Sequence, residues 1–256
     1  MSDETILSAS EGGVLTITFN RPKKKNAFTM AMYQAIVDAL RAGKEDDSVR
    51  VVLFQGTEGV FTAGNDLMDF AQNPPRSADT PVFALLEELA VYPKPVVAAV
   101  QGAAVGIGVT MLLHCDLVYA DDTAKFVMPF VNLGLVPEGA STLLLPRLAG
   151  RVTANELLMF GDPFRSDTAL EIGLINAIIE GDVQAHAKER AQVLAAKPAA
   201  SLRGTKKLIR EAMGDRVGKT LHREGALFIE RLTSPEAAEA FTAFMEKRKP
   251  DFTQFS

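Results

Sequence analysis

The chain has 256 residues, 47% of them hydrophobic and 23% charged, a composition typical of a globular protein with a large core. Its net charge of −5 argues against a nucleic-acid-binding surface, and its single cysteine, Cys115, excludes an intrachain disulfide and a cysteine-based metal site. The acidic start lacks the features of a signal peptide, and no apolar run approaches the ~20 residues of a membrane span. We therefore expect a cytoplasmic protein with no membrane or nucleic-acid partner.

Strands and helices alternate in the first 180 residues. Apolar runs predict strands at 14–19, 49–55, 95–100, 117–120, 125–128 and 174–179. Helical periodicity predicts helices at 30–43, with Thr29 as the N-cap, and at 81–91, 141–148, 153–160 and 166–172. Only helices follow, at 183–196, 199–213, 217–232 and 235–247. This order predicts an α/β core over residues 1–196 and a helical C-terminal subdomain over 197–256.

The most distinctive segment is 94–116, KPVVAAVQGAAVGIGVTMLLHCD. It is typical of a buried strand, a glycine-rich turn at Gly106-Ile107-Gly108, and a buried apolar helix that ends near Asp116. Such a turn presents free backbone N–H groups and the positive end of a helix dipole. A dinucleotide-binding fingerprint is disfavoured, because Met111 occupies the place of its third glycine.

A second glycine turn, Phe61-Thr62-Ala63-Gly64-Asn65-Asp66-Leu67, also follows a predicted buried strand. One interpretation is a simple strand-to-helix turn with Asp66 as the helix cap. The other is a second set of backbone donors, because two N–H groups that converge from separate turns form an oxyanion hole.

Glu138 lies in a tight loop, residues 135–141, that leads into a mostly apolar helix. A carboxyl group in an apolar pocket has a raised pKa, which suits a general base. The alternative is a carboxylate that only caps or balances the helix N-terminus. His114, within an apolar run, is predicted to be a hydrogen-bonded core residue.

Four motifs together resemble the crotonase, or enoyl-CoA hydratase/isomerase, superfamily over about residues 14–249. They are Arg21-Pro22-x-x-x-Asn26-Ala27, the 61–67 turn, the 94–116 segment and the tail at 244–249. The resemblance implies an α/β spiral of ββα units, with C-terminal helices that assemble trimers, which usually pair into hexamers. It implies an acyl-CoA thioester as substrate, with coenzyme A as part of that substrate and no separate cofactor or metal.

By position in the family motifs, the backbone N–H groups of Asn65 and Ile107 would bind the thioester oxygen. The resemblance also implies a set of coenzyme A contacts, namely Lys23, Lys25, Ala63, Gly64, Asn65, Asp66, Leu67 and, from a neighbouring subunit, Lys247. For the lysines, a solvated charge run is an equally good interpretation.

Two departures from the family pattern bear on the reaction. Hydratases of this family use two glutamates, and their positions are Thr110 and Phe130 here. Neither side chain can act as a carboxylate, so the chain looks closest to the Δ3,Δ2-enoyl-CoA isomerase branch. There, one glutamate at the Glu138 position moves a proton from C2 to C4. The alternatives are another crotonase-type enzyme, such as a hydratase or hydrolase for an unusual acyl group, and a non-catalytic CoA-binding protein.

Overall fold

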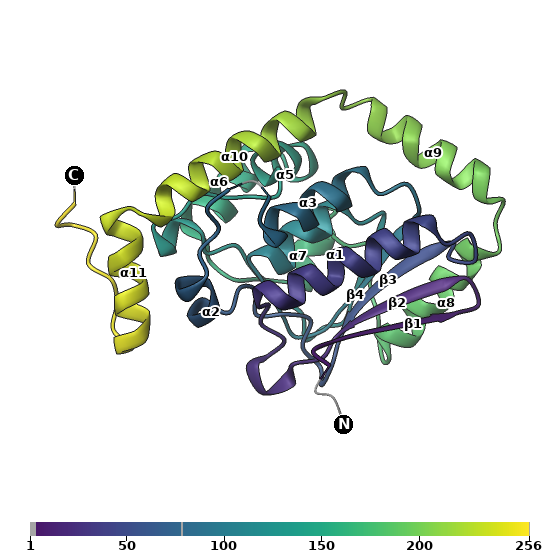
Figure 1. Ribbon diagram of the computed structural model, residues 1–256, viewed down its shortest axis with the longest axis horizontal. Coiled ribbons are helices and arrows are strands. Elements are labelled where there is room, and N and C mark those ends of the chain that lie inside the picture. The colour runs from purple at the N-terminus through teal and green to yellow at the C-terminus, as the bar shows by residue number, and fades with distance from the viewer. Residues whose placement is uncertain (1–3, 78, 256) are drawn as a thin grey trace.

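The computed structural model describes residues 4–77 and 79–255, and these form two sheets surrounded by helices (Figure 1). The larger sheet has the order β1 (Ile6–Glu11), β2 (Val14–Phe19), β3 (Val51–Gly56), β4 (Val96–Val100), β6 (Leu117–Ala120) and β9 (Ala177–Ile178). Among the described strands of this sheet, β1 and β2 pair antiparallel and the other neighbours pair parallel. The smaller sheet has the order β5 (Ala103–Val105), β7 (Lys125–Val127) and β8 (Phe164–Arg165).

Three strands were not predicted, and one is shorter than predicted. The largely exposed β1 has a mostly polar sequence, ILSASE, and becomes a strand because it pairs with β2 over six residues. The small residues of β5 and the two residues of β8 carry little strand signal of their own. The strand predicted at 174–179 contains only β9, because Leu174 and Ile175 enter the core from a turn before pairing begins.

Helices cover both faces of the larger sheet. Strands β2, β3 and β4 alternate their apolar side chains between two clusters. One cluster includes the buried residues of α1 (Met30–Glu45) and α3 (Pro81–Val91), and the other those of α8 (Val183–Ala195). Because both faces are covered, the central strands are continuously apolar, as parallel strands generally are.

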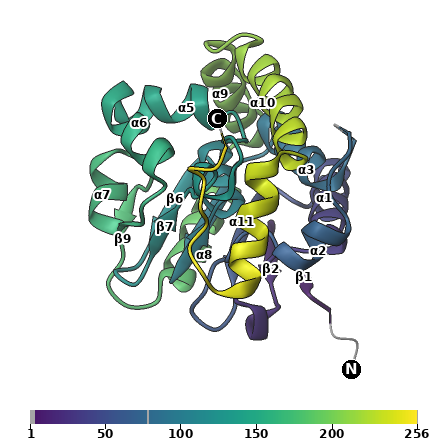
Figure 2. The same cartoon turned by 90° about the vertical axis from the view of Figure 1, so that its left-hand side faces the viewer.

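The remaining helices build the site and the periphery. They are η1 (Pro22–Lys24), α2 (Leu67–Gln72), α4 (Ile107–Thr110), η2 (Met111–His114), η3 (Val131–Leu133), α5 (Ser141–Ala149), α6 (Arg151–Phe160), α7 (Ser166–Glu171), α9 (Ala199–Glu211), α10 (Arg216–Leu232) and α11 (Pro235–Glu246). Figures 1 and 2 show α9 and α10 arching over one side of the molecule, with α11 at its far end. The helix predicted up to Asp116 is instead the short α4 followed by the 3₁₀ turn η2.

The C-terminal helices reach back to the core. Helix α10 contacts α3 and α5, and α11 contacts η3 and α10. These contacts do not mark a boundary, so the division into a core over residues 1–196 and a C-terminal subdomain over 197–256 stays a prediction. Among the described residues, no helix is both long and apolar enough to cross a membrane.

Candidate active site

The two glycine turns lie against each other. The N–H of Thr62 donates to the carbonyl of Ala103 at 2.9 Å, and the N–H of Val105 donates to the carbonyl of Thr62 at 3.1 Å. Gly64 has φ +80°, and a Cβ at this position would stand 2.6 Å from the carbonyl oxygen of Val105. Glycine is therefore required for the close approach of the two turns.

Within residues 4–77 and 79–255, both turns contain backbone donors without an acceptor, among them the N–H groups of Asn65 and Ile107. Ile107 is the first residue of α4, after Gly106 at φ +56°, so its N–H has no partner within the helix. The Tyr33 hydroxyl donates to the Asn65 side-chain oxygen from α1. The N–H groups of Asn65 and Ile107 thus belong to backbone that tertiary contacts hold in place.

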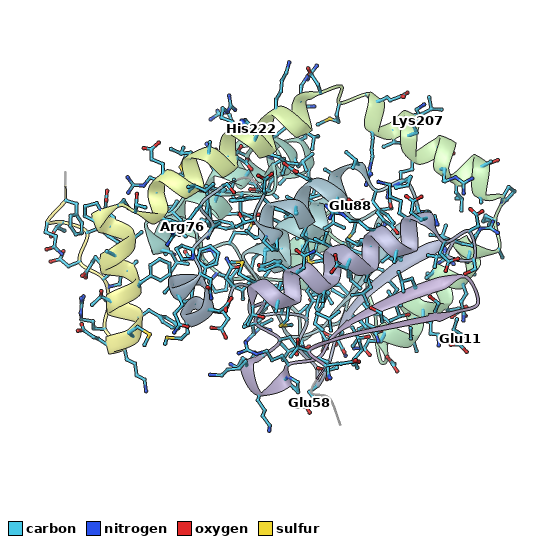
Figure 3. The ribbon with its side chains drawn as sticks, viewed as in Figure 1. Glu11, Glu58, Arg76, Glu88, Lys207 and His222 are labelled. Carbon is cyan, nitrogen blue, oxygen red and sulfur yellow. The ribbon has the colours of Figure 1, made fainter. Side chains whose placement is uncertain are left out.

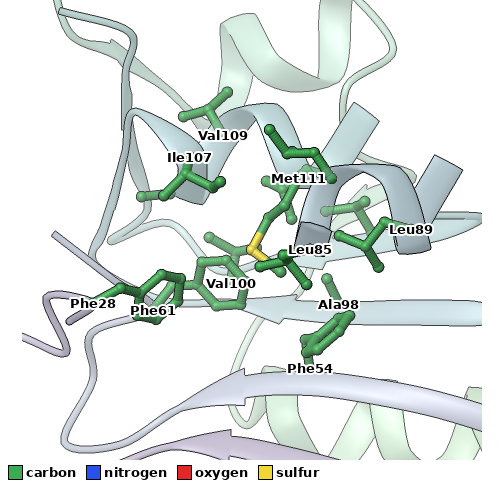
Figure 4. Packing of buried hydrophobic residues seen from close by; sticks show 14 of the residues in the cluster. Phe28, Phe54, Phe61, Leu85, Leu89, Ala98, Val100, Ile107, Val109 and Met111 are labelled. Atoms are coloured by element: carbon green, nitrogen blue, oxygen red, sulfur yellow. The ribbon is translucent and has the colours of Figure 1, made fainter. Parts of the chain in front are cut away.

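The Ile107 side chain anchors its turn in the core. It is 2% exposed and belongs to the same cluster as Phe28, Phe61 and Val100. Figure 4 shows Ile107 and Val109 above Val100 and these two phenylalanines. The N–H of Ile107 can therefore face a ligand while its side chain remains buried.

The loop that carries Lys23 and Lys25 runs beside the glycine turn at 61–67. The N–H of Ala63 donates to the carbonyl of Lys25 at 2.9 Å, and that of Phe28 to the carbonyl of Gly64 at 2.7 Å. Asn26, which is fully buried, donates to the carbonyl of Val60 at 2.7 Å. The exposed Lys23 and Lys25 are thus close in the fold to the turn at 61–67.

The Asp66 carboxylate is already engaged. It caps α2 through the N–H groups of Met68 and Asp69, and it forms an ion pair with Arg21 at 2.6 Å. Partial burial raises the pKa of Asp66, but the Arg21 hydrogen bond and the Asp69 N–H outweigh it and lower this pKa below its ordinary value. The capping interpretation therefore describes this side chain. Lys247 is the exposed C-cap residue of α11, a helix that packs on η3 and α10 rather than on this turn.

Glu138 is a buried carboxyl group with one free oxygen. Its side chain is 4% exposed, and Oε1 accepts a 2.5 Å hydrogen bond from the Thr110 hydroxyl. Its Oε2 is buried and has no partner among the described residues. Burial raises the pKa of Glu138 to about 8, with a further contribution from the charge of Glu224 and opposition from the Thr110 hydrogen bond. The group can therefore gain and lose a proton near neutral pH.

His114 is a structural residue, as the sequence predicts. Its Nε2 lies 2.8 Å from the carbonyl oxygen of Gly139, which can only accept, so this nitrogen carries the hydrogen. Burial lowers the pKa of His114 to about 4, and the ring is neutral at pH 7.

A small apolar cavity of about 160 Å³ lies beside Glu138. Its lining comes from α3, the 138–139 turn and α10, and consists of Phe83, Leu86, Glu87, Glu138, Gly139, Leu221, His222, Gly225, Ala226 and Ile229. Phe70, Phe83 and Phe130 surround Phe228 of α10 with edge-on ring contacts. His222, labelled on α10 in Figure 3, is exposed and borders this cavity.

Sequence reasoning did not assign three residues at this site. The sequence predicts no contact for Thr110, which only occupies the place of a missing glutamate. Tyr33 lies on the apolar face of α1, where a tyrosine is typical of an ordinary core residue. Glu224 belongs to a strongly amphipathic helix, where a glutamate normally signals a solvated face. Only the tertiary contacts reveal the partners of these side chains. Among the described residues, no three His, Cys, Asp or Glu side chains gather as a metal site would require.

A buried carboxyl group of raised pKa, near two adjacent glycine turns on a core of parallel strands, is consistent with the acyl-CoA enzyme class that the motifs resemble. The enoyl-CoA hydratase/isomerase family model matches residues 9–255. The chain belongs to this family, and both the resemblance drawn from the motifs and the α/β crotonase-type fold are confirmed.

Individual relatives carry different activities. The 1,2-epoxyphenylacetyl-CoA isomerase of Escherichia coli (strain K12) is 36% identical, and the match covers 98% of each chain. Enoyl-CoA delta isomerase 2 of Rattus norvegicus is 37% identical over 96% of this chain, which spans 64% of that protein. A crystal structure of an enoyl-CoA hydratase/isomerase from Pseudoalteromonas atlantica T6c superimposes with a TM-score of 0.92, at 39% identity, over 98% of this chain and 100% of the other.

Proposed function

We propose that this protein is a Δ3,Δ2-enoyl-CoA isomerase in which Glu138 shuttles the proton. The observation that carries the proposal is the buried carboxyl group of Glu138, whose Oε2 has no partner in the described chain while Oε1 is held by Thr110. A free oxygen on a fixed side chain is available to a substrate hydrogen.

The reaction needs an acid–base group and a site for negative charge. Glu138 would remove a proton from C2 of a 3-enoyl-CoA, and the electron pair would delocalise onto the thioester oxygen. The N–H groups of Asn65 and Ile107 would donate to that oxygen, at about 3–4 kcal/mol of stabilisation each. Protonated Glu138 would then return the proton to C4, and the double bond would move to C2–C3.

Two features support isomerisation over hydration. Two-carboxylate hydration needs a second free acid–base group, and the family positions for it hold Thr110 and Phe130. The other nearby carboxylate, Glu224, uses both oxygens to accept hydrogen bonds from the start of α5. The apolar cavity would also keep water from the dienolate.

Binding of the coenzyme A portion would use the adjoining surface. We propose that residues 63–67 line its path and that Lys23 and Lys25 meet its phosphates, since the 25–28 backbone runs along this turn. We further propose a trimer or a pair of trimers, in which Lys247 reaches a neighbour's substrate. Exposed apolar side chains on α9 and α11, including Leu208, Ile209 and Phe244, support burial in an assembly. Light scattering would measure the oligomer.

The decisive experiment is turnover of a panel of 3-enoyl and 2-enoyl CoA thioesters by the wild type and Glu138→Gln. We expect isomerisation of 3-enoyl substrates, little hydration of 2-enoyl substrates, and a loss of several orders of magnitude in the variant. Near-wild-type turnover by Glu138→Gln would contradict the proposal. Binding without turnover across the panel would favour a non-catalytic CoA-binding protein.

A second candidate is isomerisation of an acyl group that carries a six-membered ring. The cavity at Glu138 is close in size to the ~150 Å³ apolar cavity that accommodates benzene in an engineered protein. The Escherichia coli relative named for a phenylacetyl derivative covers nearly the whole chain. Faster turnover of ring-bearing than of linear acyl-CoA substrates in the same panel would favour this candidate.

A further inference from the structure

The Gly139–Ala140 peptide unit, one residue beyond Glu138, is held at both ends by buried side chains. The carbonyl of Gly139 accepts from His114 at 2.8 Å, and the N–H of Ala140 donates to Oε2 of Glu224 at 2.6 Å. Gly139 has φ +73° and Ala140 has φ +56°. A left-handed conformation costs an alanine about 1–2 kcal/mol, so this turn depends on the contacts that hold it.

The second oxygen of Glu224 binds the same segment. Its Oε1 accepts from the N–H of Thr142 at 3.0 Å and also from the Thr142 hydroxyl. These donors lie at the start of α5, where backbone N–H groups lack helical partners and favour negative charge. Glu224 itself comes from α10 and is only 6% exposed. The contact therefore joins α10, which lines the cavity, to the turn that carries Glu138.

We propose that Glu224 is a positioning residue whose carboxylate clamps the turn that carries Glu138 and places a buried negative charge behind that carboxyl group. The inference rests on the proposed role of Glu138. Glu224 accepts three hydrogen bonds and Glu138 accepts one, so Glu224 ionises first. Its charge then adds to burial in raising the pKa of Glu138, which makes Glu138 a stronger base for a weakly acidic C–H group.

Other titratable groups approach Glu138 from every neighbouring element. They are Tyr33 from α1, Glu87 from α3, His114 from η2 and His222 from α10, while Arg223 of α10 is close to Glu224. Tyr33 and His114 are neutral at pH 7, because burial raises the pKa of the first and lowers that of the second. Glu87 and His222 are exposed, and Arg223 acts on Glu224, whose pKa it helps to lower against the effect of burial. Among the described residues, Glu224 is therefore the buried charge that acts on Glu138.

The first test measures the proton affinity of Glu138 without any substrate. Carboxyl ¹³C NMR titration of the wild type and of Glu224→Gln follows the Glu138 signal, which the Glu138→Gln spectrum identifies. Removal of the neighbouring charge should lower the pKa of Glu138 by about one unit. Glu230→Gln, at an exposed position on the same helix, is the matched control and should leave it unchanged. If the pKa of Glu138 in Glu224→Gln equals that in the wild type, the proposed electrostatic effect of Glu224 on Glu138 is wrong.

The second test separates the clamp from the charge. Glu224→Asp keeps the charge, but its carboxylate is about 1.5 Å shorter in reach and cannot span Ala140 and Thr142. We expect kcat to fall about 10²-fold with an unchanged KM, because Glu138 is displaced while the thioester contacts remain. In Glu224→Gln, the acidic limb of the pH profile of kcat should also move to lower pH, because the pKa of Glu138 falls. Wild-type kcat in a folded Glu224→Asp, verified by circular dichroism, would overturn the clamp.

Different results would contradict the proposed isomerase activity and the proposed positioning role of Glu224. If no thioester is turned over by the wild type but the Glu138 signal shifts in Glu224→Gln, the proposed isomerase is wrong and the contact between the two glutamates stands. If the wild type is active and neither Glu224 variant differs from it, the isomerase stands and the positioning role is wrong.

Discussion

The Thr110 hydroxyl donates a 2.5 Å hydrogen bond to Oε1 of Glu138. The motif resemblance assigns the position of Thr110 to one of the two hydratase glutamates. The residue that departs from the hydratase pattern is thus the one that orients the remaining carboxyl group. Both side chains are buried, and Gly139 allows them to meet, because a Cβ there would stand 2.8 Å from Cβ of Thr110.

Thr110→Val tests this relationship, because valine keeps the shape and loses the donor. A hydrogen bond to a charged group contributes about 1.5–3 kcal/mol, and its loss should raise the pKa of Glu138 by about one unit or more. The acidic limb of the kcat profile should move to higher pH, opposite to the shift expected for Glu224→Gln. Thr110→Ser, which keeps the hydroxyl, should retain the wild-type pH profile of kcat. A wild-type pH profile in Thr110→Val would refute the role of the hydroxyl.

Glu138→Gln should stabilise the fold. The pKa of Glu138 is raised from its ordinary 4.5 to about 8, so the unfolded chain releases this proton at lower pH than the folded protein does. The carboxyl group therefore destabilises the folded state increasingly as pH rises from 4.5 to 8. At about 1.4 kcal/mol per unit, the gain in free energy of unfolding is about 3 kcal/mol at pH 7 and nearly absent below pH 4.5. Urea denaturation of the wild type and Glu138→Gln at pH 4.5 and pH 7 measures this difference in free energy of unfolding. An equal difference at the two pH values would be inconsistent with a buried carboxyl group of raised pKa.

Tyr33→Phe should weaken the oxyanion site while leaving the pH profile unchanged. The variant removes the donor to the Asn65 side chain and leaves its oxygen unpaired, at a cost of about 1–3 kcal/mol. Tyr33 is neutral throughout the assay range, since burial raises its pKa well above 10. We expect kcat to fall by roughly tenfold. A shifted acidic limb instead would show that Tyr33 acts on Glu138.

Gly64→Ala and Gly106→Ala form a matched pair. Both glycines have positive φ, so each substitution adds backbone strain of about 1–3 kcal/mol. At Gly64 the new Cβ would also stand 2.6 Å from the Val105 carbonyl, whereas at Gly106 nothing lies within 4 Å. Gly64→Ala should therefore lower the melting temperature more and abolish activity. Wild-type stability and activity in Gly64→Ala would contradict the close approach of the turns.

Much of this protein could be predicted from local sequence patterns. Thr29 caps α1 as expected, and the two glycine turns and the buried Glu138 lie where their neighbours in sequence indicate. These features depend on interactions within a few residues, such as hydrophobic periodicity, capping and the need for positive φ. The exposed β1 was missed because its strand character comes from pairing with β2.

The tertiary structure alone decided which side chains serve Glu138. Thr110 and Glu224 are 28 and 84 residues away from the residues they hold, Glu138 and Ala140. Such hydrogen bonds depend on how α4, α5 and α10 approach one another, and no local pattern contains that information. The sequence determined the carboxyl group and the two turns with free N–H groups. The packing of distant helices determined the proton affinity and orientation of that carboxyl group, because burial and neighbouring charge arise only when the chain folds.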